Sequence, residues 1–245
     1  RLMFHPNAKL EFVYSTPNAG KPLSVAHHDL LGDIEMNSTD TINPNVDVLF
    51  LCLGHGNSIS FLENNQFSDA TKIIDLGNDF RLVKDKDFNG KSFVYGLPEL
   101  NKADIKNAQY IANPGCFATA IQLALLPLAA DGLLSEDVHI NATTGSTGAG
   151  VGLAATSHFS WRNNNFSHYK VFEHQHLGEI NQSIKQLQAE YTDELIFVPN
   201  RGDFPRGIFA TLYTKSEESL ENVVAKYEAF YADQPFVTVT TTNIN

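Results

Sequence analysis

The chain has 245 residues, enough for one large domain or two modest ones with a sizeable core. Apolar residues make up 42% and charged residues 18%, which excludes a disordered chain, and no apolar run approaches the roughly 18 residues that span a bilayer. The formal net charge of -11, with no basic stripe along the sequence, argues against nucleic acid as a partner. Two cysteines are too few for a disulfide framework, so we expect a cytoplasmic protein without membrane contact.

The first part of the chain predicts strands separated by crossover segments. After a helix tail over residues 2–6, residues 9–15 (KLEFVYS) are rich in β-branched and aromatic side chains and predict a strand. Residues 46–53 (VDVLFLCL) are almost continuously apolar before a Gly-His-Gly turn, which is typical of a parallel strand buried on both faces. Residues 71–76 repeat this pattern more briefly. Three such strands predict an open α/β sheet.

Beyond about residue 113 the pattern changes to longer helices and further strands. Apolar residues recur at helical spacing over 116–130, directly after an Asn-Pro-Gly turn, and again over 180–191 and 220–230. Strands are predicted over 138–144, 195–198, 208–214 and 236–239. The run from Gly145 to Gly150 is rich in glycine and small residues and predicts a tight loop.

Cys116 is the most informative candidate for chemistry. It follows Asn113-Pro114-Gly115 at the first turn of a predicted helix, where free N–H groups and the helix dipole favour a thiolate. The same N–H groups would stabilise an oxyanion on an attacked carbonyl. The alternative is a small buried cysteine that packs as a hydrophobe, which fits Cys52 inside its apolar strand.

His174, His176 and Glu179 are candidates for proton transfer. An imidazole near a thiolate activates it or protonates a leaving oxygen. Two other interpretations stay open: a histidine pair with a structural role, and a metal site, because histidines two apart on a strand face the same side. For a metal site the sequence offers no obvious third and fourth ligand.

Two further segments have the composition of anion sites. The loop from Gly145 to Gly150 would offer backbone N–H groups to a phosphate or carboxylate, although such turns are more often only turns. Arg201 and Arg206 bracket Gly-Asp-Phe-Pro before a strand, and guanidinium forks suit the same anions. Solvated loop arginines are the commoner case.

Six motifs in a fixed order resemble one family, the N-acetyl-gamma-glutamyl-phosphate reductases of arginine biosynthesis, which are relatives of aspartate-semialdehyde dehydrogenase. The motifs are DLGNDFR at 75–81, YGLPE at 95–99, NPGC at 113–116, STGAG at 146–150, HQHLGEI at 174–180 and RGI at 206–208. The departures are Thr147 in place of a common serine, Gly178 in place of a usual proline, and Phe117 where the family often has tyrosine.

The resemblance implies an α/β fold with two domains. Residues 1–113 would form a Rossmann-like NADP-binding domain, and residues 114–245 an α+β catalytic and dimerisation domain of the semialdehyde dehydrogenase type. It further implies NADPH-dependent reduction of N-acetyl-L-glutamyl 5-phosphate to the 5-semialdehyde through a cysteine thioester. A homo-oligomer, dimer or tetramer, and a small acyl phosphate as substrate complete this expectation.

The resemblance also assigns roles at the active site. Cys116 would be the nucleophile and His176 the acid/base, with His174 as the second choice because the sequence does not show which ring faces the sulfur. The residues expected to hold substrate are Asn113, Ser146, Gly148, Glu179 and Arg206, and Glu179 has the further option of orienting a histidine. No metal is expected.

The expected cofactor site is partial. Ser15, Thr16, Asn18 and Ala19 form a hydroxyl-and-amide turn after the strand predicted over 9–15, and the absence of a carboxylate there favours NADP(H) over NAD. Gly54 and His55 would border the cofactor from another strand end. No G-x-x-G-x-x-G occurs, so we expect the first βα unit of the family, and a C-terminal segment, to be missing from this chain.

Several alternatives remain at this point. The nearest rival is aspartate-semialdehyde dehydrogenase, against which HQHLGEI and YGLPE argue. A cofactor-independent cysteine hydrolase or acyltransferase is a second, and a binding module that has lost its cofactor turn is a third. The acyl group is open between acetyl and succinyl, and the loop 161–165 (WRNNN) is where we expect that selectivity.

Overall fold

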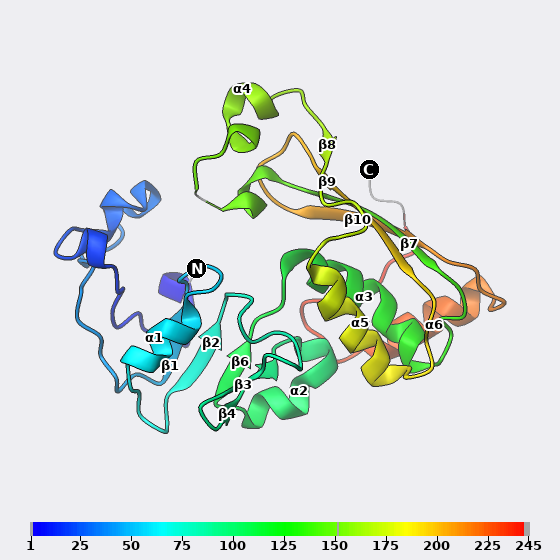
Figure 1. The fold of residues 1–245 in the computed structure, drawn as a ribbon, viewed down its shortest axis with the longest axis horizontal. Coiled ribbons are helices and arrows are strands. Elements are labelled where there is room, and N and C mark those ends of the chain that lie inside the picture. Colours follow the sequence, from blue (N-terminus) through cyan, green and yellow to red (C-terminus); the bar gives the residue numbers. More distant parts are fainter. Residues whose placement is uncertain (1, 151, 243–245) are drawn as a thin grey trace.

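The structure is a computed structural model that describes residues 2–150 and 152–242. Two four-stranded sheets lie side by side, each with its own helices (Figure 1), and β3 and β4 form a separate antiparallel pair among the described residues. The helices are α1 (Ser58–Asn64), α2 (Pro98–Asn107), α3 (Cys116–Ala130), α4 (Phe159–Arg162), α5 (His176–Leu187) and α6 (Leu220–Tyr231). The strands are β1 (Val48–Leu51), β2 (Lys72–Asp75), β3 (Asp87–Phe88), β4 (Lys91–Ser92), β5 (Val94–Tyr95), β6 (Tyr110–Ala112), β7 (Val138–Thr144), β8 (Ser167–His168), β9 (Leu195–Arg201) and β10 (Ile208–Tyr213). Short 3-10 helices lie at Leu2–Phe4, Thr16–Asn18, Leu23–Val25, His28–Leu30, Ser146–Ala149 and Ala155–Ser157.

The first sheet has the order β1-β2-β6-β5, and every neighbouring pair is parallel. Strands predicted over 46–53 and 71–76 are confirmed with shorter bounds, as β1 and β2. A cluster of apolar side chains fills its core, including Leu51, Ile73 and the stacked rings of Phe80 and Phe93. The α/β fold class is confirmed for this half of the chain.

Two predicted strands are wrong. Residues 9–15 form no strand, and Tyr14 makes only an isolated bridge with Thr39. Residues 236–239 form none either. A strand exists only where a second strand pairs with it, and neither segment lies beside one, so side chains with β preference are not enough. The helix tail expected over 2–6 is a single 3-10 turn, Leu2–Phe4.

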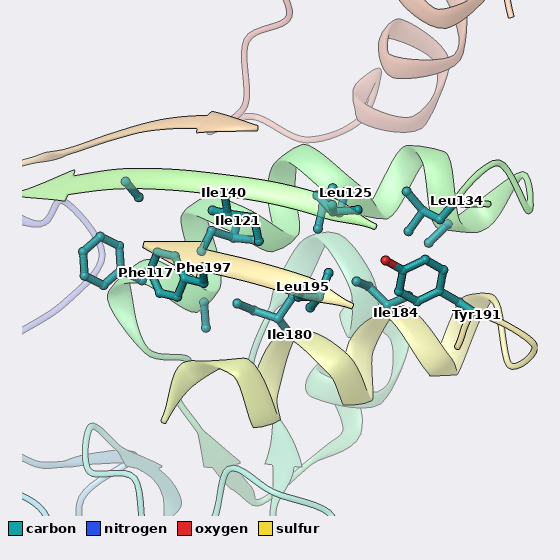
Figure 2. Packing of buried hydrophobic residues seen from close by; sticks show 14 residues of the cluster. Phe117, Ile121, Leu125, Leu134, Ile140, Ile180, Ile184, Tyr191, Leu195 and Phe197 are labelled. Carbon is teal, nitrogen blue, oxygen red and sulfur yellow. The ribbon is translucent and has the colours of Figure 1, made fainter. Parts of the chain in front are cut away.

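The second sheet has the order β10-β7-β9-β8, in which only β7 and β9 are parallel. Helices α3 and α5 pack together against one face of it, and α6 packs on α3 (Figure 1). Figure 2 shows the core between them, where Ile121 and Leu125 of α3 meet Ile140 and Phe197 of the sheet and Ile180 of α5. The strands predicted over 138–144, 195–198 and 208–214 are confirmed as β7, β9 and β10.

The connection between the two sheets is the turn at residues 113–115. It leaves β6 in the first sheet and leads into α3 beneath the second (Figure 1). Gly115 is the extended N-cap residue of α3, so the predicted start at residue 116 and end at residue 130 are confirmed. The turn therefore stands at the boundary between the two halves, and Cys116 is the first residue after it.

One face of α5 makes polar contacts with the first half of the chain. Gln182 donates to Arg81 O at 2.8 Å and accepts from Val83 N at 3.1 Å, and Gln186 donates to Asn101 Oδ1 at 2.8 Å. These glutamines lie one helical turn apart, as the helical repeat requires. Helix α5 is thus apolar toward its sheet and polar toward the first half.

Candidate active site

Cys116 lies at the amino end of a helix that points toward the boundary of the two halves. Main-chain hydrogen bonds hold the turn that leads into this helix. Asn113 N donates to Asp75 O at 2.8 Å, and Thr119 N donates to Gly115 O at 2.8 Å. Cys116 is a free, exposed cysteine rather than a buried one. The first N–H groups of any α-helix lack intrahelical acceptors, so those beside the sulfur are available to an anion.

The ring of His176 lies directly against Gly115. A Cβ atom added to Gly115 would lie 2.3 Å from His176 Nε2, closer than any real contact. This is the physical reason for glycine in the Asn-Pro-Gly-Cys turn: any side chain there would displace the imidazole. The first turn of α5 therefore brings Nε2 of His176 next to the residue that precedes the cysteine.

His174 and His176 are held in different hydrogen-bonding states. His174 Nδ1 accepts the backbone N–H of His176 at 3.2 Å, so in the neutral ring the proton sits on Nε2. The ring centroids lie 4.6 Å apart, and His176 Nδ1 is buried without a partner among the described residues. His174 is thus a fixed donor through Nε2, whereas His176 has no hydrogen bond that fixes its tautomer.

Both imidazoles are neutral at physiological pH. Burial lowers the pKa of His174 to about 4, and the neighbouring His176 and Lys170 act in the same direction. Burial likewise lowers the pKa of His176 to about 4, helped by the charge of Arg81. A neutral ring accepts a proton, so the site holds a base beside the cysteine.

Glu179 lies one turn further along α5 and is only 3% exposed. Its Oε2 accepts Gly115 N–H at 2.9 Å and the hydroxyl of Tyr95 at 2.8 Å. Its Oε1 accepts Arg81 NH1 at 3.3 Å and lies 3.9 Å from His176 Nε2. Both oxygens therefore accept hydrogen bonds from protein donors, which come from both halves of the chain.

A tyrosine and an arginine extend the site on the side of His174. The ring of Tyr169 lies 5.8 Å from that of His174, and the guanidinium of Arg201 stands 4.8 Å from the Tyr169 centroid. Arg201 also donates to Thr156 Oγ1 at 3.2 Å. Arg206, the arginine expected to hold substrate, is exposed in the loop before β10.

The loop 145–150 packs on the segment before β10. Ser146 N donates to Phe204 O at 2.9 Å and Thr147 N donates to Pro205 O at 3.0 Å, while Gly148 N donates to Gly145 O at 3.3 Å. These N–H groups are not available as an anion cradle, so that sequence hypothesis is wrong for them. The side chain of Ser146 makes no hydrogen bond among the described residues and is the group left to face a ligand.

The carboxyl ends of β1 and β2 form the place where open parallel sheets bind nucleotides. Gly54 and Gly56 have φ of +80° and +81° in the loop after β1, and the latter donates its N–H to Asp79 Oδ2 at 3.0 Å. The turn at Ser15 and Asn18, joined by a 3.4 Å side-chain bond, carries hydroxyl and amide groups and no carboxylate. The hydroxyl, amide and glycine groups of these two turns are of kinds that fit a nicotinamide dinucleotide.

The part of the chain that the structure describes has no group of three or more His, Cys, Asp or Glu arranged to hold a metal ion. Within residues 2–150 and 152–242, no helix combines the length and apolar character needed to cross a membrane.

Arg81 and Tyr95 are site residues to which the sequence assigned no role. Their segments, DLGNDFR and YGLPE, resemble family motifs but carry no local signal of a contact with Glu179. Each lies more than 80 residues from Glu179 in sequence, so their contact depends on the tertiary structure. A buried arginine, 6% exposed, is the physical signal that marks such a network once a structure exists.

Comparisons with known proteins define first a class and then a family. Residues 1–108 match a family model described as semialdehyde dehydrogenase, NAD binding domain, and residues 116–245 match semialdehyde dehydrogenase, dimerisation domain. The chain is thus an oxidoreductase of the semialdehyde dehydrogenase class, with a domain for a nicotinamide dinucleotide.

Proteins named N-acetyl-gamma-glutamyl-phosphate reductase are similar over the whole chain. The protein of Flavobacterium johnsoniae is 75% identical over 100% of this chain and 75% of its own length. That of Christiangramia forsetii is 59% identical over 98% of this chain and 73% of its own length, and that of Bacteroides fragilis (strain YCH46) is 51% identical over 100% and 75%. The chain belongs to the N-acetyl-gamma-glutamyl-phosphate reductase family, which confirms the resemblance inferred from the six motifs.

Solved structures agree at the level of the fold. Aspartate semialdehyde dehydrogenase II from Vibrio cholerae has a TM-score of 0.61 at 15% identity and covers 89% of this chain and 70% of its own. The aspartate semialdehyde dehydrogenase with NADP from Candida albicans has a TM-score of 0.59 at 14% identity, over 92% and 70%. The semialdehyde dehydrogenase architecture is confirmed.

Proposed function

We propose that this chain reduces N-acetyl-L-glutamyl 5-phosphate to N-acetyl-L-glutamate 5-semialdehyde with NADPH, in arginine biosynthesis. The observation that carries the proposal is the exposed Cys116 at the start of α3, with the neutral ring of His176 against the preceding residue. This pairing brings a nucleophile, a base and an oxyanion site together at the start of α3.

In the first half of the reaction, the Cys116 sulfur attacks the acyl carbon and the bond to phosphate breaks. His176 takes the thiol proton at Nε2 and passes it to the departing phosphate oxygen. The N–H groups at the start of α3 stabilise the oxyanion that forms during attack. The product on the protein is a thioester of Cys116.

In the second half, the residues at the carboxyl ends of β1 and β2 would hold the dinucleotide, which when bound would supply the hydride that reduces the thioester carbon. The same N–H groups hold the oxygen while the carbon–sulfur bond breaks, and Cys116 leaves as a thiolate. His174, fixed as a donor at Nε2, is placed to hydrogen-bond substrate rather than to take up a proton. Asn113, Ser146, Arg206 and Arg201 are the residues we assign to substrate binding, without Gly148, whose N–H is already bonded to Gly145 O.

The choice of NADP(H) over NAD belongs to this proposal. Ser15, Thr16, Asn18 and Ala19 would hold the phosphorylated ribose, because a carboxylate in that turn would repel the 2′-phosphate and none is present. Gly54 and His55 would line the nearer edge of the cofactor. Comparing the KM for NADP with that for NAD tests this assignment, and a lower KM for NAD would overturn it.

The central test is phosphate-dependent reduction of NADP with N-acetylglutamate semialdehyde. We expect Cys116→Ser to lower kcat by at least about 1000-fold, because a serine hydroxyl is a far weaker nucleophile and leaving group. Cys52→Ser is the matched control and keeps full activity, since Cys52 lies at the end of β1 and takes no part in the chemistry. Full turnover by the Cys116 variant would remove this residue from the mechanism.

The substrates separate the remaining alternatives. Aspartate semialdehyde serves as the negative control, and hydrolysis without nucleotide would indicate a cysteine hydrolase instead. N-succinylglutamate semialdehyde tests the acyl group, for which we assign the loop 161–165, with Trp161 55% exposed, as the selective element. Equal rates with both acyl groups would contradict that assignment.

Assembly and location complete the proposal. The dimerisation domain description of residues 116–245 supports a homo-oligomer, dimer or tetramer. The face of the second sheet opposite α3 and α5 carries Phe209 and Tyr213, 73% and 62% exposed, and we assign it as the contact between subunits. Two free cysteines support a reducing cytoplasm.

A further inference from the structure

The carboxylate of Glu179 joins side chains from segments that lie far apart in the sequence. Arg81 follows β2, Tyr95 ends β5, and Glu179 lies in the first turn of α5. Their bonds to Glu179 span the two halves that match separate family models, at residues 1–108 and 116–245. Gln122 of α3 donates to the Tyr95 hydroxyl at 2.8 Å and extends the group further.

These side chains hold the nucleophile turn from both sides of Pro114. On one side, Arg81 Nε donates to the carbonyl of Asn113 at 2.8 Å. On the other, Glu179 Oε2 accepts the N–H of Gly115 at 2.9 Å. Arg81 and Glu179 also form an ion pair with each other, so the hydrogen bonds to Asn113 and to Gly115 belong to one connected network.

The observed contacts of this group are to other protein atoms. Arg81 and Glu179 are 6% and 3% exposed, and every oxygen of Glu179 already accepts a protein donor. Burial and the Glu179 charge raise the pKa of Tyr95, so its hydroxyl remains a donor at any working pH. A hydrogen-bonded network of this kind fixes the geometry of the groups that it joins.

We propose that Arg81, Tyr95 and Glu179 form a positioning clamp that sets the orientation of Cys116 and the start of α3 relative to the first half of the chain. The inference rests on the proposed function for its meaning in catalysis. The clamp acts through the turn: it fixes Asn113 and Gly115, and these fix the sulfur and the N–H groups that receive the oxyanion. Small misplacements of such groups cost rate rather than substrate affinity.

Tyr95→Phe is the sharpest variant, because it removes one oxygen without changing charge. The matched control is Tyr191→Phe, because Tyr191 is a buried tyrosine whose hydroxyl donates to the main-chain carbonyls of Glu136 and Glu194. Tyr191 lies at the opposite end of the core from Phe117, which follows the nucleophile (Figure 2). We expect Tyr95→Phe to lower kcat about tenfold with KM within twofold, and Tyr191→Phe to leave both within twofold.

A second readout does not depend on the enzyme's activity. Iodoacetamide alkylates both exposed cysteines, and mass spectrometry of their peptides gives the rate at Cys116 with Cys52 as an internal reference. We expect Tyr95→Phe and Glu179→Gln to change the Cys116 to Cys52 rate ratio at least threefold, and Tyr191→Phe to leave it unchanged. Equal ratios in all variants would overturn the clamp, whereas altered ratios in a chain without reductase activity would overturn only the proposed function.

Discussion

At the scale of single residues, neighbouring groups restrict which side chain fits at a position and which tautomer a histidine adopts. Gly115 has no side chain because the His176 ring occupies that space. His174 is fixed in one tautomer because its Nδ1 accepts a main-chain N–H. Both histidines are buried and neutral, which suits proton transfer and at the same time places an acid-labile feature in the fold.

The two histidines predict a loss of stability on acidification. Their folded pKa of about 4 lies below the ordinary value of 6.5, so the unfolded chain binds more protons between these values and stability falls as the pH drops through that window. By pH 5 each histidine costs about 2 kcal/mol relative to pH 7.5. Urea unfolding at the two pH values, for the natural chain and for His174→Asn, measures this contribution.

The difference between the natural chain and His174→Asn isolates the contribution of His174, because other titrating groups affect the stability of both chains equally. Asp75 acts in the opposite direction, because burial raises its pKa and acid therefore favours its folded form. Since Asp75 is present in both chains, its effect cancels in the difference. An equal pH dependence for the natural chain and the asparagine variant would show that His174 is not neutral in the folded protein.

At the scale of elements, α3 begins at Cys116 and contains a proline that interrupts its hydrogen bonding. Pro127 lies inside the helix and has no N–H, so the carbonyl of Leu123 loses its intrahelical donor. Tyr231 of α6 donates its hydroxyl to that carbonyl, and Tyr227 donates to Ala124 O. Helix α6 thus completes the hydrogen bonding of α3, and its packing follows from the proline.

This arrangement predicts a coupling between Pro127 and Tyr231. We expect Tyr231→Phe to lower the free energy of unfolding by about 1 to 2 kcal/mol, since it leaves a carbonyl without a donor. Pro127→Ala restores the helix N–H, so the same tyrosine change should cost less in that background. A double-mutant cycle by urea unfolding measures the difference. Equal costs in both backgrounds would contradict the compensation.

At the scale of the whole molecule, helices cover only one face of the second sheet among the described residues. Helices α3 and α5 bury one face of the second sheet, while the other presents alternate residues of β10 to the outside, Phe209 and Tyr213 among them. The Tyr213 ring stacks on His139 of β7 at 5.0 Å. A broad face with exposed aromatic rings fits the subunit contact proposed above.

Charge placed on that face should break the oligomer. In a two-fold interface each substitution occurs twice, so Phe209→Glu brings like charges into an apolar contact. We expect size-exclusion chromatography with light scattering to show monomers for this variant. Phe4→Glu is the control, because Phe4 is 69% exposed but lies in the first half of the chain. An unchanged oligomer for Phe209→Glu would place the contact elsewhere.

The sequence by itself determined the features that depend on neighbouring residues along the chain. Helix α3 and strand β7 were predicted with their observed bounds, because caps and side-chain periodicity are local signals. The six motifs identified the family because each is a short run of neighbouring residues that can be read directly from the sequence. By contrast, residues 9–15 have the composition of a strand and form none, because a strand needs a partner that composition does not reveal.

Only the tertiary structure decided what surrounds the nucleophile. The sequence placed Cys116, His174, His176 and Glu179 at one site but left the part played by each ring and by the carboxylate open. Contacts across more than 80 residues show Glu179 bonded to Arg81 and Tyr95. The orientation of buried polar groups depends on donors contributed by distant segments, and no local pattern encodes where those donors will lie.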